Sequence, residues 1–190
     1  MKSKLNFNIN PLGDISNIFL NNSITTFEDA CSFIQKLPYG RNANKKDITT
    51  VFIDQCATCS TKHALLKILA EENRYTDLQL MLGIFKMNEK NTPKVKAVLR
   101  QYQLDYIPEA HNYLKWQNLN VDFTHITSQS SDFENDLLEE IEIQPDQITD
   151  FKVDYHKQYL NNWLKDQYSL NYTLDELWSI REQCIVALSI

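Results

Sequence analysis

Three residues of this chain have the side chains that cysteine-based acyl transfer requires, namely Cys59, His111 and Asp122. This chemistry needs a thiolate nucleophile, a base that forms the thiolate and later protonates the leaving group, and an acid that orients the base. Each residue type is common by itself. The sequence therefore predicts a triad only if its elements bring the three side chains together.

Residues 55–69 have the pattern of an amphipathic helix that begins at Cys59. Short hydroxyl side chains surround the cysteine, as is typical of helix N-termini, where backbone N–H groups need acceptors. Apolar residues then recur at helical spacing, at positions 64, 65, 68 and 69. A cysteine in the first turn lies at the positive end of the helix dipole, which lowers the pKa of its thiol and favours the thiolate.

His111 and Asp122 belong to a predicted antiparallel hairpin over residues 111–126, with a tight turn in the middle. His111 is expected to open the first strand, and Asp122 is expected to be central in the second. Cross-strand neighbours lie about 5 Å apart, close enough for a carboxylate to meet an imidazole. Because burial of an unpaired charge is costly, a carboxylate between Val121 and Phe123 also needs a partner.

Two other chemistries use the same stretch. Cys56 and Cys59 form a C-x-x-C pair before a helix, which resembles a thioredoxin-like redox site, although no aromatic residue stands immediately before Cys56 and no Gly-Pro separates the cysteines. Zinc is the third alternative, since four side chains could serve as ligands. These are Cys56, Cys59, His63 and His111.

Several further residues have both a functional and a structural interpretation. Tyr39 and Arg41 either line the cleft, where Arg41 would recognise a substrate carboxylate, or belong to a plain turn. His63 either tunes Cys59 or is an ordinary histidine. The remaining candidates are predicted to be structural: Cys31, His125, His156 and Cys184.

The composition fits one globular domain and excludes several function classes. The 190 residues are 43% hydrophobic and carry a formal charge of −6, so we expect no nucleic-acid partner, since phosphate binding needs clustered Lys and Arg. The basic run at residues 41–46 is interpreted as a solvated loop. Three glycines leave no phosphate-binding loop, and we expect neither a signal peptide nor a membrane span. The cysteine pattern does not suggest a secreted disulfide framework, so a reducing cytoplasm is expected.

Helices on either side of a run of strands predict an α+β fold. The expected elements are a loose lead-in (1–24), a helix (25–37), a strand or short helix (47–54), the nucleophile helix (59–73), a buried strand (78–85), a helix from Pro93, the hairpin (111–126), a polar loop (128–136) and two helices (148–168 and 173–188).

The segments around the three residues resemble the transglutaminase-like branch of the papain-like cysteine-enzyme fold. The resemblance rests on Cys-Ser-Thr-Lys-His-Ala-Leu-Leu from Cys59, on Glu-Ala-His-Asn-Tyr-Leu around His111, and on Asn-Val-Asp-Phe-Thr around Asp122. It covers roughly residues 38–127. It implies that Cys59 is the nucleophile, His111 the general base and acid, and Asp122 the orienting acid. The chain departs from the family at Thr58, where Gly is usual.

The resemblance also implies the architecture and the activity. A core of residues 25–127 would pack the nucleophile helix on a small antiparallel sheet, with a lead-in (1–24) before it and a helical C-terminal extension (128–190) on the same domain. Gln55 would be an oxyanion donor. The expected reaction is acyl transfer or hydrolysis on a peptide or small amide, without a metal or organic cofactor. Since the family includes inactive members, a peptide- or partner-binding protein with the same cleft is the non-enzymatic alternative.

Overall fold

The computed structural model describes residues 5–127, 131–167 and 170–188. Helices and strands alternate along the chain as an α+β protein, which confirms the predicted class. In order, the elements are α1 (Asp14–Asn21), α2 (Phe27–Lys36), α3 (Thr50–Asp54), α4 (Cys59–Glu72), β1 (Gln79–Asn88), the 3₁₀ helix η1 (Pro93–Val95), α5 (Lys96–Gln101), β2 (Tyr106–Trp116), β3 (Leu119–Val121), α6 (Ser131–Glu134), β4 (Leu137–Ile143), the 3₁₀ helix η2 (Pro145–Ile148), α7 (Asp150–Lys165) and α8 (Leu174–Leu188).

Four antiparallel strands form one sheet in the order β3-β2-β1-β4. In the long β1–β2 pairing, His111 lies directly opposite Gly83. The strand β4 comes from the C-terminal third of the chain and pairs with β1. The C-terminal region therefore contributes to the same sheet as the predicted core, and the proposed division near residue 128 stays a prediction.

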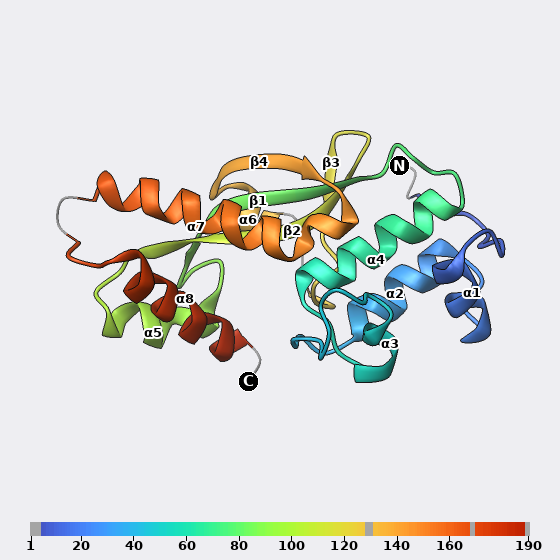
Figure 1. Ribbon diagram of the computed structural model, residues 1–190, viewed down its shortest axis with the longest axis horizontal. Helices are drawn as coiled ribbons and strands as arrows, with labels where there is room; N and C mark the ends of the chain where they lie inside the picture. Colours follow the sequence, from blue (N-terminus) through green and yellow to red (C-terminus); the bar gives the residue numbers. More distant parts are fainter. Residues whose placement is uncertain (1–4, 128–130, 168–169, 189–190) are drawn as a thin grey trace.

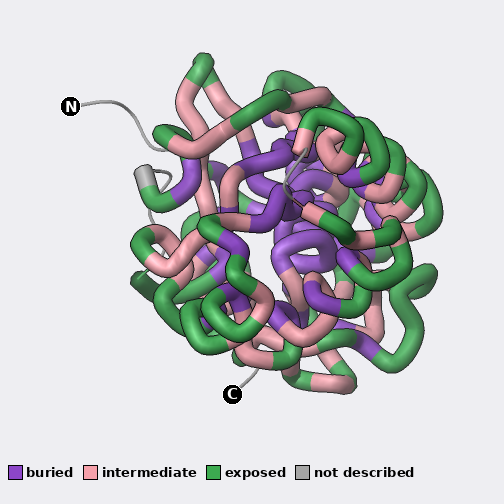
Figure 2. Tube along the Cα trace, turned by 90° about the vertical axis from the view of Figure 1, so that its left-hand side faces the viewer, coloured by how far each residue is buried: buried purple, intermediate pink, exposed green. Residues whose placement is uncertain are grey.

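Helices pack around the sheet, with α1 to α4 gathered at one end of the molecule and α5, α7 and α8 at the other (Figure 1). Because successive strand side chains point to opposite faces, β1 supplies Leu80 and Leu82 to one apolar cluster and Met81 and Met87 to a second. Figure 2 shows the buried segments in the middle of the molecule. Burial on both faces explains the uninterrupted apolar pattern of this strand.

The helix α4 confirms the helix predicted to begin at Cys59. Thr58 caps it: its hydroxyl accepts from the N–H of Thr61, and the Thr61 hydroxyl accepts from the N–H of Thr58. The side chain of Asn73 bonds back to the Leu69 carbonyl at the C-terminal end, at 2.9 Å. Nearly every residue from Cys59 to Ala70 is buried, so the helix lies inside the molecule and positions its first turn rigidly.

The expectation of a loose lead-in was wrong, because residues 14–21 form the helix α1 with Ile15 and Phe19 buried. Its N-terminus has no local side-chain cap. The carboxylate of Glu72, at the end of α4, accepts instead from the N–H groups of Ile15 and Ser16, at 3.0 and 2.6 Å. A cap supplied from so far along the chain leaves no local pattern to recognise.

The hairpin is present, but its strands differ from the expected ones. Gln117 and Asn118 both have positive φ, as a two-residue hairpin turn requires. β2 starts at Tyr106, so His111 lies within the strand rather than at its beginning. β3 ends at Val121, so Asp122 directly follows it. This strand stops because the next residues bond to side chains instead of the ladder, as described below.

The remaining helices agree broadly with expectation except α6, which lies within the predicted polar loop 128–136, and one strand was missed. Residues 50–54 adopt the helical alternative, and α5, α7 and α8 lie in the predicted regions. The predicted ends at residues 128–130 and 168 lie outside the described residues. The missed strand β4 is short and acidic, with Glu at positions 139, 140 and 142, and charged edge strands give a weak apolar signal. None of the described helices has both the length and the apolar character needed to cross a bilayer.

Candidate active site

Cys59 is the first residue of α4 and lies where two cavities meet. Its residue surface is 6% exposed. A large cavity of about 460 Å³ and a smaller one of about 150 Å³ are both lined by this cysteine. The thiol is therefore accessible to a small molecule that enters either cavity, although most of the residue is buried.

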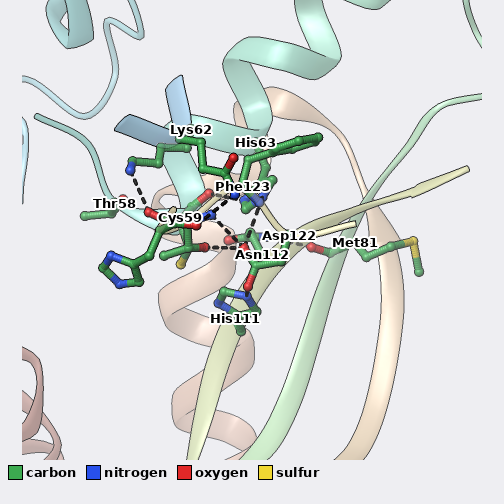
Figure 3. A network of polar contacts seen from close by, with 12 residues as sticks. Thr58, Cys59, Lys62, His63, Met81, His111, Asn112, Asp122 and Phe123 are labelled. Carbon is green, nitrogen blue, oxygen red and sulfur yellow. Dashed lines mark hydrogen bonds and ion pairs between the residues drawn. The ribbon is translucent and has the colours of Figure 1, made fainter. Parts of the chain in front are cut away.

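His111 and Asp122 meet beside this cysteine (Figure 3). His111 Nε2 lies 3.1 Å from Asp122 Oδ2. The Cys59 sulfur accepts hydrogen bonds from the His111 side chain and from the backbone N–H of Asn112. Because Asp122 occupies Nε2, the other ring nitrogen, Nδ1, faces the sulfur. The three residues thus form a continuous chain from sulfur to carboxylate, as the triad hypothesis requires.

Asp122 is fixed in place by the segment that follows it. Its Oδ1 accepts from the backbone N–H of Thr124 at 2.8 Å and from the Thr124 hydroxyl at 2.5 Å. These bonds turn the chain away from the sheet after Val121. They leave Oδ2 for His111, so the carboxylate orients the imidazole while its own position is set locally.

His63 connects the nucleophile helix to the same segment. Its Nε2 accepts the N–H of Phe123 at 2.8 Å, which requires the proton to be on Nδ1, and Nδ1 donates to the Cys59 carbonyl at 2.8 Å. Burial, which the Asp122 charge only partly offsets, lowers the pKa of His63 to about 4. His63 is therefore a neutral, buried positioning residue and not a second base.

The charges of the site favour a thiolate and an imidazolium. Burial opposes charge on both groups. For Cys59, the cations of Lys152 and His111 outweigh burial and hold the thiol pKa well below its usual range. For His111, the carboxylate of Asp122 and the Cys59 thiolate outweigh burial and raise the pKa well above its usual range. The nucleophile is thereby ionised before any substrate arrives.

Lys152 is a site residue that the sequence analysis missed. It lies in the first turn of α7 and is 8% exposed, and its Nζ lies 3.8 Å from Cys59 Sγ. A signal was present in the sequence, because Lys152 shares the helical spacing of Ile148, Tyr155 and Tyr159, the apolar side of that helix. A lysine on an apolar stripe indicates a buried charge that needs a partner.

Ion pairs join α8 to its neighbours in the wall of the large cavity. Arg181 of α8 binds both carboxylate oxygens of the buried Glu109, with Nε–Oε2 at 2.8 Å and Nη2–Oε1 at 2.5 Å. Its guanidinium also lies over the Trp178 ring, 5.1 Å from the centroid. Glu182 accepts from both Arg181 and Arg41. The C-terminal helix thereby forms part of the cleft.

The three weaker candidates, Tyr39, Arg41 and Gln55, differ in whether they line the cavities beside Cys59. Tyr39 lines both cavities, and burial together with the Cys59 charge raises the pKa of its hydroxyl. Arg41 lines the large cavity, but its guanidinium is paired with Glu182 at 2.6 Å. Gln55 is exposed, lines neither cavity, and donates its amide to the Phe52 carbonyl. The structure therefore brings Tyr39 to the thiol but not Gln55.

The redox and zinc alternatives have less support from this geometry. Cys56 and Cys59 are both free thiols, and burial and the Asp54 charge raise the pKa of Cys56. The sheet is wholly antiparallel, whereas a redox C-x-x-C belongs with a βαβ unit. Over the described ranges, no three His, Cys, Asp or Glu side chains are arranged to hold a metal. Cys31 and Cys184 are buried, as expected.

No protein-family model, curated protein or solved structure matches this chain. The interpretation of the site therefore depends on its own residues and their geometry.

Proposed function

We propose that this protein is a cysteine-dependent hydrolase or acyltransferase that acts on an amide or peptide bond. The observation that carries the proposal is the hydrogen-bonded chain from Cys59 through His111 to Asp122 at the junction of two cavities. A thiolate paired with an imidazolium suits covalent acyl transfer, because one group attacks while the other supplies the proton for the leaving amine.

In the proposed mechanism, the Cys59 thiolate attacks the substrate carbonyl carbon, and the new C–S bond places the negative charge on the carbonyl oxygen. The N–H groups of Cys59 and Ser60 begin the helix α4, so they have no acceptor within the helix and can donate to this oxyanion. As the C–N bond breaks, the His111 proton passes to the leaving nitrogen. The neutral imidazole then takes a proton from water or an amine as it attacks the thioester carbonyl. The C–S bond breaks, the acid or amide product is released, and the thiolate–imidazolium pair is restored.

The two cavities suggest the direction in which a substrate binds. His111 lines only the smaller cavity, so the leaving amine belongs there, within reach of the proton. Ser60 and Thr61, at the N-terminus of α4, line only the larger cavity, so the acyl part belongs there. The larger volume lies within the range of small-molecule sites, about 300–1,000 Å³.

The family assignment is part of this proposal. A cysteine at the start of a buried helix, with histidine on the adjacent β2 and aspartate after β3, supports a transglutaminase-like member of the papain-like fold. The carboxylate after a hairpin strand, instead of within it, is a departure from the expected pattern. A reducing, cytoplasmic location is proposed on the same basis, because the mechanism needs a free thiol.

The first test is selective acylation and alkylation of Cys59. We expect iodoacetamide at neutral pH to modify Cys59 faster than Cys31, Cys56 or Cys184, and His111→Ala to slow this reaction. With 4-nitrophenyl acetate we expect a burst of one nitrophenol per protein, an acetyl group on Cys59 by mass spectrometry, and slow release that requires His111.

Matched variants make the result decisive. Cys59→Ala should abolish the burst, while Cys56→Ala should retain it. Equal labelling of all four cysteines, or a burst that survives Cys59→Ala, would overturn the proposal. A reactive Cys59 whose acetyl group is never released would instead support the binding protein with a degenerate site.

A further inference from the structure

A buried lysine contacts the nucleophilic sulfur from the C-terminal part of the chain. Lys152 Nζ donates to Ser60 Oγ at 2.8 Å, to Asn112 Oδ1 at 2.7 Å and to Cys59 Sγ at 3.8 Å. An ammonium group has three N–H donors. All three are thus accounted for by these acceptors, which come from α4 and β2.

This cation has no carboxylate partner. Over the part of the chain that the structure describes, no ion pair joins Lys152 to an Asp or Glu. Glu109 is the acidic group that influences it most, and both its oxygens are bound by Arg181. A buried cation needs a nearby anion, and the group that can carry negative charge in direct contact is the Cys59 sulfur.

We propose that Lys152 is a thiolate-stabilising residue, a second cation that contacts the sulfur in addition to His111. Its further role, which rests on the proposed acyl transfer, is to stabilise the oxyanion in the first step. When Sγ bonds to the carbonyl carbon, the negative charge moves from sulfur to oxygen. Lys152 lines the large cavity together with Ser60, where the carbonyl oxygen would lie.

Burial and titration are consistent with this geometry. Burial lowers the pKa of Lys152, and the Cys59 charge acts in the opposite direction. The charge of Lys152 is the largest single cause that lowers the pKa of Cys59, while His111 lowers it through both its charge and a hydrogen bond. The two groups therefore stabilise each other's charged form, so loss of one should make the other titrate closer to its neutral state.

A purely structural role makes a different prediction. Lys152 joins α7 to α4 and β2 through Ser60 and Asn112, and the Asn112 amide in turn donates to the Met81 carbonyl at 2.9 Å. If this connection were its only role, any side chain that keeps the two hydrogen bonds would leave the thiol unchanged. The test must therefore change the charge of residue 152 while it keeps the hydrogen bonds to Ser60 and Asn112.

The experiment measures the rate of Cys59 alkylation by iodoacetamide from pH 4.5 to 10 in the full chain. Lys152→Gln removes the charge but keeps a donor for Ser60 and Asn112, whereas Lys152→Arg keeps the charge. Lys165→Gln, an exposed position at the other end of α7, is the matched control. The absorbance of the thiolate at 240 nm gives a second readout without any reagent.

We expect the midpoint of the alkylation profile to rise by at least about one pH unit in Lys152→Gln. Well below the midpoint this corresponds to about tenfold slower labelling. Lys152→Arg and Lys165→Gln should stay near the wild type. Equal midpoints in wild type and a folded Lys152→Gln would overturn the inference.

Protein stability is controlled separately. Each variant is first checked by circular dichroism and thermal unfolding. If Lys152→Gln does not fold, Lys152→Met replaces it, because the Ser60 hydroxyl still donates to Asn112 Oδ1 at 2.9 Å without the lysine. The readout is thiol ionisation, not turnover. A failure to hydrolyse any ester would therefore count against the proposed function, while the Lys152 inference would still be decided by the alkylation profile.

Discussion

At the residue scale, the site depends on a proton that is held between a sulfur and a carboxylate. Asp122 raises the pKa of His111, while Lys152 and His111 lower the pKa of Cys59, both against the effect of burial. The two shifts separate the titrations of base and nucleophile. At pH values between the pKa of Cys59 and the pKa of His111, the protein holds a thiolate and an imidazolium together. This is the ionisation state that the proposed acylation requires.

The pH dependence of acyl transfer follows from these shifts. The thiolate forms as pH rises through the lowered pKa of Cys59, about 6, and the imidazolium is lost as pH rises through the raised pKa of His111, about 10. We expect kcat/KM for an amide substrate to form a bell with a plateau between these values, because the leaving amine needs the imidazolium proton. Alkylation of Cys59 should rise on the acidic side but stay high above pH 10, because it needs only the thiolate. Coincident profiles for the two reactions would contradict this assignment.

His63 offers a test of stability at the same scale. His63→Leu removes the acceptor of the Phe123 N–H and a second donor to the Cys59 carbonyl, which still accepts a backbone N–H within α4. We expect the unpaired Phe123 N–H to cost about 1–3 kcal/mol of unfolding free energy. The folded-state pKa of His63 is lowered by burial to about 4 from its ordinary value of 6.5. The neutral histidine therefore stabilises the protein above pH 6.5, and this contribution is lost as pH falls towards 4, because the unfolded chain binds the proton first.

The measurement is urea unfolding of both proteins at pH 7.5, 6, 5 and 4.5. The wild type should lose stability over this range more steeply than His63→Leu, because the variant lacks the titrating group. Parallel pH profiles would show that His63 does not contribute to this dependence.

At the element scale, the central strands set the position of His111. Gly83 on β1 lies opposite His111 on β2. A Cβ at Gly83 would come within 2.8 Å of Leu137 Cδ1 and 2.9 Å of Tyr113 Cε1. The Tyr113 ring stacks beside the His111 ring, with centroids 6.0 Å apart. The missing side chain at Gly83 therefore leaves room for the residues that pack around His111.

Gly83→Ala is expected to affect both stability and the site. Overpacking of this kind costs about 1–3 kcal/mol, and displacement of Tyr113 should slow Cys59 acylation more than a surface change of equal cost. Gly13→Ala is the control, because the added methyl would displace the Glu72 carboxylate that caps α1 and not the residues around His111. Thermal unfolding and the acylation burst should be measured on both. A Gly83→Ala protein with unchanged stability and burst kinetics would contradict the packing argument.

At the scale of the whole molecule, the cleft is assembled from both halves of the chain. The helices α1 to α4 supply the nucleophile and its cap, whereas α7 and α8 supply Lys152 and Arg181 (Figure 1). The two apolar clusters meet at β1, which contributes to each. Loss of the contacts between β2 and α8 should therefore lower the unfolding free energy of the whole domain and not only disturb one wall of the cleft.

The Glu109–Arg181 pair tests this connection. Arg181→Leu would leave the buried Glu109 carboxylate unpaired, which typically costs about 3–5 kcal/mol. The double variant Arg181→Leu with Glu109→Leu should recover much of that loss, since both charges are removed. Arg100→Leu is the control: Arg100 pairs with Glu89 at the surface, where such pairs contribute about 0–1 kcal/mol. Equal effects of the two arginine changes in urea unfolding would show that the buried pair does not connect the halves.

The sequence by itself determined the local features of this protein. The hydroxyl residues around Cys59 and the apolar stripe beyond it specified α4, and the apolar run specified β1. The helices predicted from residues 25 and 173 begin at Phe27 and Leu174, after the capping residues Thr26 and Thr173. These signals are local, because capping and side-chain periodicity depend on residues within about one turn of each other. The same reasoning identified Cys59, His111 and Asp122 as candidates.

Tertiary structure alone decided the features that join distant segments. The cap of α1 by Glu72, the pairing of the acidic strand β4 with β1, and the approach of Lys152 to Cys59 each connect residues far apart in the chain. The position of Asp122 just after β3, and of Gln55 away from the thiol, likewise depend on neighbours from other elements. Such contacts form because burial forces polar groups to find partners wherever the fold brings them. No local pattern specifies which partner that will be.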